Sequence, residues 1–243
     1  MRTRFTMAMP ALFSTLANGA RLVRELARLP VAPLRFELGR NPDGIRRAHA
    51  LFTQRHARYK VIGNKTMGIA LIDLKAFQGQ PSAYLATVQR SGHAGPQSKK
   101  ATARGYTLRR IDRNAHIDAI HAIHTSSGER QGRPMDDSVV AIKTAYDDPS
   151  HVECHGVFDA TGKLVAYCSM GRYGNFVATD ELMGYKNQDG IMYLLLSTIV
   201  CRLIEEGEAD YFMYDTYLGA KPGLRDFKRR VGFQPYRARY ALV

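Results

Sequence analysis

The sequence predicts an α/β fold of the α+β kind, in which a mixed, largely antiparallel sheet is flanked by helices. The first observation behind this prediction is composition, because 45% of the 243 residues are hydrophobic, enough to fill the core of one large domain or two small ones. The second is pattern, since apolar runs typical of strands and of helices alternate through the second half, with turn residues between them. Their order is β-β-β-α-β-α-β, and the first three strands form an antiparallel meander.

Residues 1–33 are expected to form an amphipathic helical extension. Apolar side chains recur at helical spacing over residues 10–29, and the opposite side carries a basic ridge of Arg21, Arg24 and Arg28. Prolines then end the helix. The ridge is either a solvated face or a contact for an anionic membrane or partner. A secretory signal is an alternative, although a proline and polar residues interrupt the apolar region.

Residues 34–104 are expected to form an N-terminal subdomain in which the sequence shows no recognisable chemistry. A turn at residues 41–44 precedes a helix predicted over 45–59. A continuous apolar run within 61–77 predicts one buried strand or two paired strands. Helical segments are predicted in 81–104, on either side of a break that contains glycine and proline.

Residues 105–243 are expected to form the main domain. Strands are predicted at 106–111, 151–158, 163–172, 176–185, 211–217 and 233–242. Helices are predicted at 115–124, 190–206 and 224–230. Gly207 follows the long helix directly, a position where a left-handed glycine commonly ends a helix.

Charge and cysteine usage narrow the functional classes. The formal net charge of +13 favours polyanionic partners such as RNA, nucleotide-linked substrates or an anionic membrane surface. Three cysteines without paired spacing indicate neither a disulfide framework nor a zinc knuckle, so a reducing, cytoplasmic compartment is expected. No apolar run approaches the roughly 20 residues that span a bilayer. The histidines lack a motif of known metal-ligand spacing, so no metal site is expected.

Three segments resemble one family of enzymes. Residues 223–233, GLRDFKRRVGF, are similar to the Gly-Leu, Phe-Lys and Gly-Phe segment of the Fem-type aminoacyl transferases. Residues 98–106, SKKATARGY, resemble the basic entry of that family from a helix into a strand. Residues 125–132, TSSGERQG, resemble its Thr-x-x-Arg-x-Gly pattern. The order of elements also resembles the second half of a GNAT acyltransferase, so the resemblance covers residues 98–243.

The resemblance implies a GNAT-like fold and an N-acyltransferase that moves an aminoacyl group from aminoacyl-tRNA to an amine, without a cofactor, a metal or a covalent enzyme intermediate. Fem-type enzymes usually carry two GNAT domains, so residues 34–104 would be a truncated first half. Coenzyme A users show a Gln/Arg-x-x-Gly-x-Gly/Ala loop whose backbone amides hold the pyrophosphate. Residues 184–190, GYKNQDG, lack that spacing and place Asp189 at the helix start, which makes acyl-CoA the weaker donor hypothesis.

Three residues are candidates for the chemistry of amide formation. The resemblance places Lys228 near the reacting carbonyl or the terminal ribose of the donor, where a cation stabilises developing negative charge. Alternation along 211–217 places Asp215 and Tyr217 on one face at the end of the strand. There Asp215 could accept the proton of the amine, and Tyr217 could return a proton to the leaving oxygen. The alternatives are a surface lysine in a basic run and a structural hydrogen bond at a strand end.

Six further residues are candidates for substrate binding because they are cationic or aromatic. They are Arg130, Arg133, Phe227, Lys99, Lys100 and Arg104. The two loop arginines can hold phosphate or carboxylate through paired hydrogen bonds. The cations of 99–104 could follow a nucleic-acid backbone. A solvated loop and a plain exposed helix face are the alternatives.

Three functional hypotheses follow. The first is transfer from aminoacyl-tRNA to an amine-bearing acceptor. The second keeps the fold and the acceptor but uses an acyl-CoA or acyl-carrier-protein thioester. The third is a non-catalytic basic protein on a GNAT scaffold that binds RNA or a membrane surface.

Overall fold

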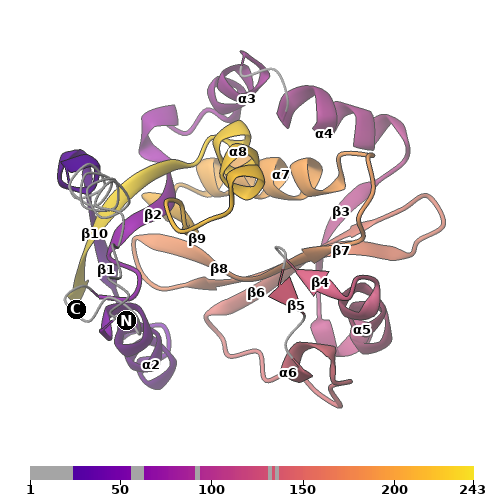
Figure 1. Ribbon diagram of the computed structural model, residues 1–243, viewed down its shortest axis with the longest axis horizontal. Helices are drawn as coiled ribbons and strands as arrows, with labels where there is room; N and C mark the ends of the chain where they lie inside the picture. Colours follow the sequence, from indigo (N-terminus) through magenta and orange to yellow (C-terminus); the bar gives the residue numbers. More distant parts are fainter. Residues whose placement is uncertain (1–23, 56–62, 91–93, 131–132, 135–136) are drawn as a thin grey trace, which may run out of the picture.

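The computed structural model describes residues 24–55, 63–90, 94–130, 133–134 and 137–243. Its centre is an open eight-stranded sheet in the order β1-β10-β2-β9-β8-β7-β6-β3 (Figure 1). Only two pairs of neighbours, β1 with β10 and β8 with β9, run parallel. The other neighbours are antiparallel. The predicted mixed, largely antiparallel sheet is therefore confirmed.

The sheet strands are β1 (Val31–Phe36), β2 (Met67–Asp73), β3 (Thr107–Ile111), β6 (Val152–Phe158), β7 (Leu164–Arg172), β8 (Phe176–Gly184), β9 (Tyr211–Thr216) and β10 (Gln234–Leu242). A separate hairpin pairs β4 (Glu129–Arg130) with β5 (Arg133–Pro134). The helices are α2 (Pro42–Thr53), α3 (Pro81–Arg90), α4 (Ala94–Ala103), α5 (Ile117–Thr125), α6 (Asp137–Val140), α7 (Ile191–Glu206) and α8 (Pro222–Val231), with 3-10 turns at Lys75–Phe77 and Arg113–His116.

Helices cover both faces of the sheet, because strand side chains alternate between two cores. On β2, Ala70 and Ile72 pack into the core under α3, α4 and α7, whereas Ile69 and Leu71 pack into the core under α2. A third core lies under α5 and contains Ile120 and other buried residues of α5, β6 and β7. In Figure 1, α3, α4, α7 and α8 lie on one side of the sheet and α2, α5 and α6 on the other.

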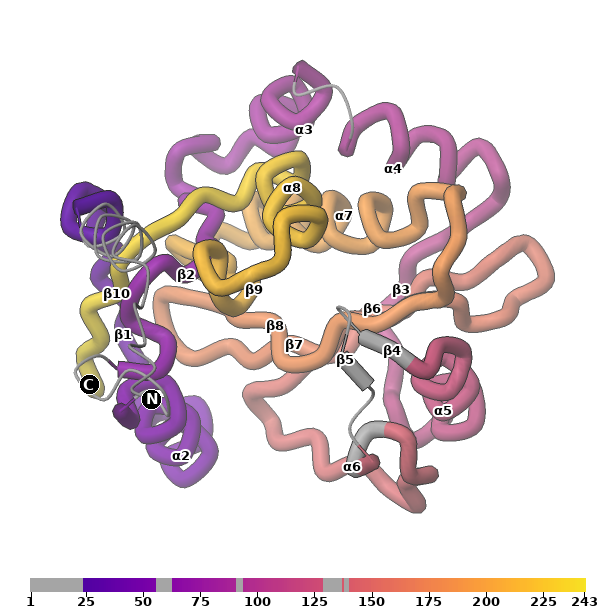
Figure 2. Tube along the Cα trace, in the orientation of Figure 1, coloured from indigo at the N-terminus to yellow at the C-terminus, as the bar shows by residue number. Residues whose placement is uncertain are grey.

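The first part of the chain contributes strands to the same sheet as the last part. β1 forms an edge beside β10, and Pro33 is tolerated there because an edge strand can leave one backbone position unpaired. β2 lies between β9 and β10. Figure 2 shows these early strands next to the yellow C-terminal strand. The helix expected over 10–29 falls mostly outside the described residues, and its described part is helical over residues 24–28.

The long helix α7 is fixed at both ends. At its start, Gly190 has φ 85°, and a Cβ there would lie 2.3 Å from the backbone oxygen of Gln97. At its end, Gly207 adopts the predicted left-handed conformation, with φ 65°. No helix among the described residues is long and apolar enough to cross a membrane.

Candidate active site

A pocket of about 720 Å³ opens where β8 and β9 separate. The two strands pair in parallel only between residues 176–178 and 211–213, although β8 continues to Gly184 and β9 to Thr216. The space beyond the last pair is closed by the first turn of α7, by α8 and by the end of α5. We call it the β8–β9 pocket. It is lined by Gln97, Lys100, Ile123, His124, Ser126, Ser127, Leu182, Met183, Gly184, Tyr185, Lys186, Asn187, Gln188, Gly190, Ile191, Met192, Tyr193, Tyr214, Leu224, Phe227 and Arg230.

The walls of the β8–β9 pocket are mainly apolar and aromatic. Phe227, one of the predicted substrate-binding residues, packs on Tyr193 with ring centroids 4.9 Å apart. Three lining residues carry positive charge, namely Lys100, Lys186 and Arg230. None of the described lining residues is an Asp or Glu. Arg230 is already paired with Asp226 at 2.6 Å, so Lys100 and Lys186 are the other cations among the described lining residues. The pocket therefore favours apolar groups inside and negative charge near these two lysines.

The predicted cations of α4 hold the loop that leads into α7. Lys100 lines the pocket, and its Nζ donates a hydrogen bond of 2.8 Å to the carbonyl of Gln188. Arg104 forms an ion pair with Asp189, whose carboxylate also accepts a 2.8 Å hydrogen bond from Tyr106. Lys99 is exposed. Arg104 thus compensates the negative charge of Asp189 at the start of α7. This pairing weakens the repulsion between Asp189 and a bound phosphate that the sequence predicts.

Lys228 is buried, with 1% of its surface exposed, and it is absent from the residues that line the pocket. Its Nζ donates hydrogen bonds of 2.6 Å to the carbonyls of Tyr214 and Thr216, and lies 4.1 Å from the centre of the Tyr214 ring. Burial lowers the pKa of Lys228 to about 8, against a smaller opposing effect of Asp215. Lys228 therefore fixes the end of β9 and supports Tyr214, which does line the pocket.

Asp215 and Tyr217 also lie outside the pocket lining. Asp215 has φ 48°, so the alternation assumed for this strand end is interrupted at that residue. Its half-exposed side chain pairs with Lys65 at 3.4 Å. The backbone N–H of Tyr217 donates to the carbonyl of Gly68 at 2.6 Å, and its ring packs against the core under α7.

Arg130 and Arg133 face each other in the short β4–β5 hairpin. Their side chains lie outside the described residues, so their proposed contact with phosphate or carboxylate stays a prediction.

His124 is not among the candidate residues that the sequence suggests, yet it is 3% exposed and lines the pocket. Its Nε2 lies 2.5 Å from the hydroxyl oxygen of Tyr167. Spacing could have indicated burial, because His124 follows the buried Ile120 by four residues and so shares its face of α5.

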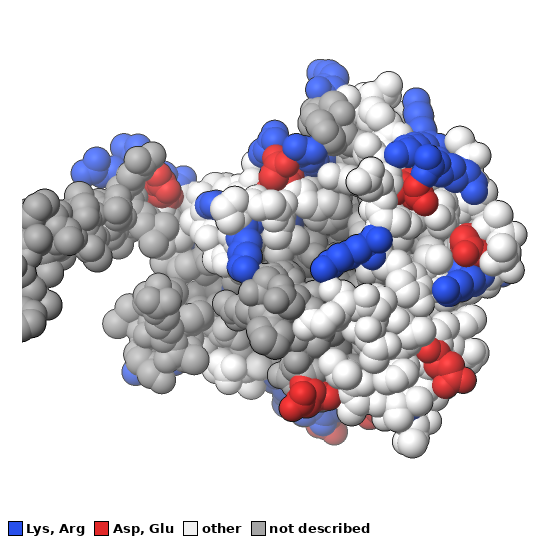
Figure 3. Space-filling view, turned by 45° about the vertical axis from the view of Figure 1, so that its right-hand side comes forward, with Lys and Arg blue, Asp and Glu red and all other residues white. Residues whose placement is uncertain are grey.

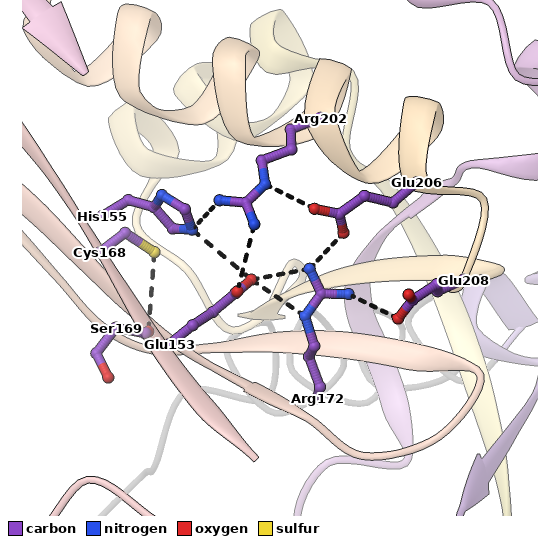
Figure 4. Close-up of polar contacts among 8 residues, drawn as sticks. All are labelled: Glu153, His155, Cys168, Ser169, Arg172, Arg202, Glu206 and Glu208. Atoms are coloured by element: carbon purple, nitrogen blue, oxygen red, sulfur yellow. Dashed lines mark hydrogen bonds and ion pairs between the residues drawn. The ribbon is translucent and has the colours of Figure 1, made fainter. Parts of the chain in front are cut away.

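A second polar cluster holds the far end of α7 on the sheet (Figure 4). Arg172 of β7 bonds to Glu153 at 3.0 Å and to Glu206 at 2.5 Å, and Arg202 bonds to Glu206 at 2.6 Å. Burial by itself raises the pKa of Glu153, but hydrogen bonds with His155 and Arg172, together with the charge of Arg172, outweigh it and lower this pKa to about 2. These charges compensate one another, so we interpret the cluster as structural.

Charge on the face shown in Figure 3 is mixed. Lys and Arg side chains there lie among Asp and Glu side chains and do not form one continuous patch. Among the described residues, no group of three His, Cys, Asp or Glu side chains could hold a metal ion.

No protein-family model matches the chain, and no curated protein matches it. Solved structures do. FemX matches with a TM-score of 0.52 and 11% identity, over 70% of this chain and 59% of that chain. The C-terminal domain of a provisionally assigned lysylphosphatidylglycerol synthetase from Agrobacterium fabrum matches with a TM-score of 0.45 and 16% identity, over 69% and 57%. L-PGS from Bacillus licheniformis matches with a TM-score of 0.41 and 15% identity, over 70% and 59%.

This chain spans 57–59% of the length of these three structures. The match to FemX shows a GNAT-like fold of the Fem type, which confirms the predicted fold class and the family resemblance at the level of the fold. At 11% identity it shows the fold alone.

Proposed function

We propose that this chain is an N-acyltransferase that joins an activated acyl group to an amine in the β8–β9 pocket. The observation that carries the proposal is the position of this pocket, at the divergence of two parallel strands and beside the start of the long helix, in a chain folded like FemX. Such a pocket can hold an acyl carbon and an amine together, and bringing the two together removes much of the entropic barrier of the reaction.

The lining of the pocket favours the reactive form of an amine. An amine attacks a carbonyl only when it is neutral, and apolar surroundings and nearby cations both lower the pKa of an amine. The β8–β9 pocket supplies apolar walls together with Lys100 and Lys186. It would also exclude water, which otherwise competes with the amine for the acyl group.

We favour aminoacyl-tRNA as the donor. The fold is of the Fem type, the chain carries a net charge of +13, and cations border the pocket. A polyanionic donor would be attracted to such a chain, and its terminal ester would be the acyl group transferred.

A thioester donor is the second candidate. The first turn of α7 lines the pocket, and its N-cap residue, Gly190, offers no side-chain cap to the backbone amides of that turn. Such amides can bind phosphate. The pairing of Asp189 with Arg104 removes an obstacle to this mode.

The test uses the full chain with two sets of donors: a tRNA pool charged with labelled amino acids, and acyl thioesters of coenzyme A. A cell metabolite extract supplies the amines, and formation of labelled amide is measured with and without ribonuclease. Ribonuclease-sensitive transfer supports the tRNA donor, whereas transfer only from thioesters supports the second candidate. If neither donor gives an amide, acyl transfer is wrong and the non-catalytic binding hypothesis gains weight.

A variant that fills the pocket connects activity to this site. Leu224→Trp places a larger side chain among the lining residues and is expected to abolish transfer. Leu85→Trp is the matched control, because Leu85 is 40% exposed on α3 and does not line the pocket. Equal activity of the two variants would place the reaction elsewhere.

A further inference from the structure

The interior of the β8–β9 pocket is apolar on several sides. Ile123 of α5, Leu182 of β8 and Ile191 of α7 are buried and line it. The buried ring of Tyr214, on β9, lines it as well. Contact between such walls and an apolar group removes both from water, which is favourable roughly in proportion to the area covered. The interior therefore holds an apolar group better than a polar group of the same size.

Two aromatic rings form a further wall. Tyr193 of α7 and Phe227 of α8 are half-buried and line the pocket, with ring centroids 4.9 Å apart and an angle of 53° between the rings. Arg230 donates a hydrogen bond to the Tyr193 hydroxyl and pairs with Asp226 at 2.6 Å, and these contacts hold the Tyr193 ring in place. Aromatic rings in fixed positions suit an aromatic or long aliphatic group.

The polar part of the lining lies nearer the solvent. Lys186, Asn187 and Gln188 line the pocket and are exposed. Lys100 is half-buried and is tied to this loop by the hydrogen bond of its Nζ to the carbonyl of Gln188, at 2.8 Å. A cation that entered the pocket would be repelled by both lysines and would lose its water against the apolar walls. An uncharged group avoids both costs.

The volume of the pocket argues for a large group. About 720 Å³ lies within the range of pockets that enclose whole small molecules. An acyl carbon and an amine occupy only a small part of this space. A glycyl or alanyl group would leave most of the apolar wall in contact with water, whereas an aromatic or long aliphatic side chain would cover it.

We propose that the acyl group transferred by this chain carries a large, uncharged, apolar side chain. Tyr193 and Phe227 select it by contact, and Lys100 and Lys186 reject a cationic side chain. This assignment rests on the proposed function and adds the substrate class. The reaction is the same for every acyl group: the bond from the acyl carbon to the leaving oxygen or sulfur breaks, the bond to the amine nitrogen forms, and the proton of the amine ends on the leaving atom.

The first test measures binding without a reaction. Four amides serve as probes of the acyl group, and saturation-transfer NMR with the full chain gives their Kd values. Heptanamide and 6-aminohexanamide have the same length and differ in a terminal cation, and heptanamide should bind at least about tenfold more tightly. 3-Phenylpropanamide should exceed propanamide by a similar factor. Equal binding within either pair, or no binding of the apolar probes, would overturn the proposal.

Variants locate this preference in the β8–β9 pocket. Phe227→Ala should weaken binding of 3-phenylpropanamide by about three- to tenfold. Leu224→Glu places a carboxylate in the lining and should reverse the preference, so that 6-aminohexanamide binds more tightly than heptanamide. Leu224 is the third residue of α8, where a glutamate suits the helix dipole, so this variant should fold.

Leu85→Glu is the matched control, because Leu85 is exposed on α3 and does not line the pocket. It should bind all four probes as the wild type does. If Leu224→Glu also keeps the wild-type preference, the selection does not occur in this pocket and the proposal is wrong.

The second test compares donors in the transfer assay above. The donors are tRNA charged with phenylalanine, leucine, alanine or lysine, and the coenzyme A thioesters of the four acids that correspond to the probes. We expect kcat/KM to be about 10- to 200-fold higher for the large apolar acyl groups than for the small or cationic ones. Efficient transfer with a preference for lysyl or alanyl groups would refute this inference alone. Transfer from none of the donors would refute the proposed function itself, whatever the probes show.

Discussion

Lys228→Met should change how the stability of the fold depends on pH. Methionine keeps the volume and flexibility of the lysine stem and removes the amine that bonds to Tyr214 and Thr216. In the folded wild type, burial lowers the pKa of Lys228 to about 8, whereas an unperturbed lysine titrates at 10.5. Between these values the unfolded chain holds the proton and the folded chain has lost it. The free energy of unfolding of the wild type therefore rises with pH through this window.

The size of the effect follows from the two pKa values. Because each factor of ten corresponds to 1.36 kcal/mol, the wild type should gain up to about 3 kcal/mol relative to Lys228→Met between pH 7 and 10.5. A neutral amine still has two hydrogens, enough for both carbonyls. At high pH the variant should be less stable by about 2–4 kcal/mol, because both carbonyls lose their partner. Near pH 7 the two effects should largely cancel.

Urea unfolding of both proteins at pH values from 7 to 10 measures this difference directly. Lys99→Met is the control, since Lys99 is exposed and its variant should follow the wild type at every pH. A constant stability difference between wild type and Lys228→Met across the range would refute the buried, perturbed amine. Because Lys228→Met is expected to change the stability of the fold, loss of transfer in a Lys228 variant does not by itself show that Lys228 contacts the substrate.

Three further perturbations test structural contacts outside the pocket lining. Arg172→Met should destabilise the fold by about 3–5 kcal/mol in urea unfolding, because it removes the nearest cation from the buried Glu153 and leaves only the longer contacts to Arg202 and His155; a smaller loss than in Arg40→Met would contradict this. Since the pKa of Glu153 is about 2 in the fold and 4.5 in an unperturbed carboxyl, the stability that it contributes relative to Glu153→Gln should be full above pH 4.5 and be lost as pH falls toward 2. Asp215→Gly should be more stable than Asp215→Ala by about 1 kcal/mol in thermal unfolding, because φ is 48° there, and equal stability would argue against that conformation.

Local patterns predicted most of the second half of the chain. The hairpin expected at 151–158 and 163–172 is β6 and β7, and the helix expected at 190–206 is α7. These elements are set by alternation, by helical spacing and by glycine turns, all of which are visible over a few residues. The helix expected at 45–59 begins earlier, at Pro42, because Asn41 caps it and proline suits a first helical turn.

The site was harder to predict because it depends on which face of a short helix is buried. Lys228 lies four residues after Leu224 and three before Val231, so it shares a face with both, yet its charge suggested exposure. A lysine can be buried on that face because the carbonyl groups of Tyr214 and Thr216, at the end of β9, accept hydrogen bonds from its amine. Tyr167, which bonds to His124, is 43 residues away in sequence, and no local pattern connects the two.

The opening between β8 and β9 is held by the part of the chain in which the sequence shows no chemistry. Where β9 leaves β8, its backbone pairs with β2, which matches Ile69 to Thr216 and Leu71 to Met213. Gly68 continues this contact by accepting hydrogen bonds from the backbone of Tyr217 and Leu218. Without β2, the end of β9 would lose these bonds and could pair further along β8, which would close the pocket. Residues 67–73 are therefore as necessary to the proposed active site as the residues that line it, although none of them enters it.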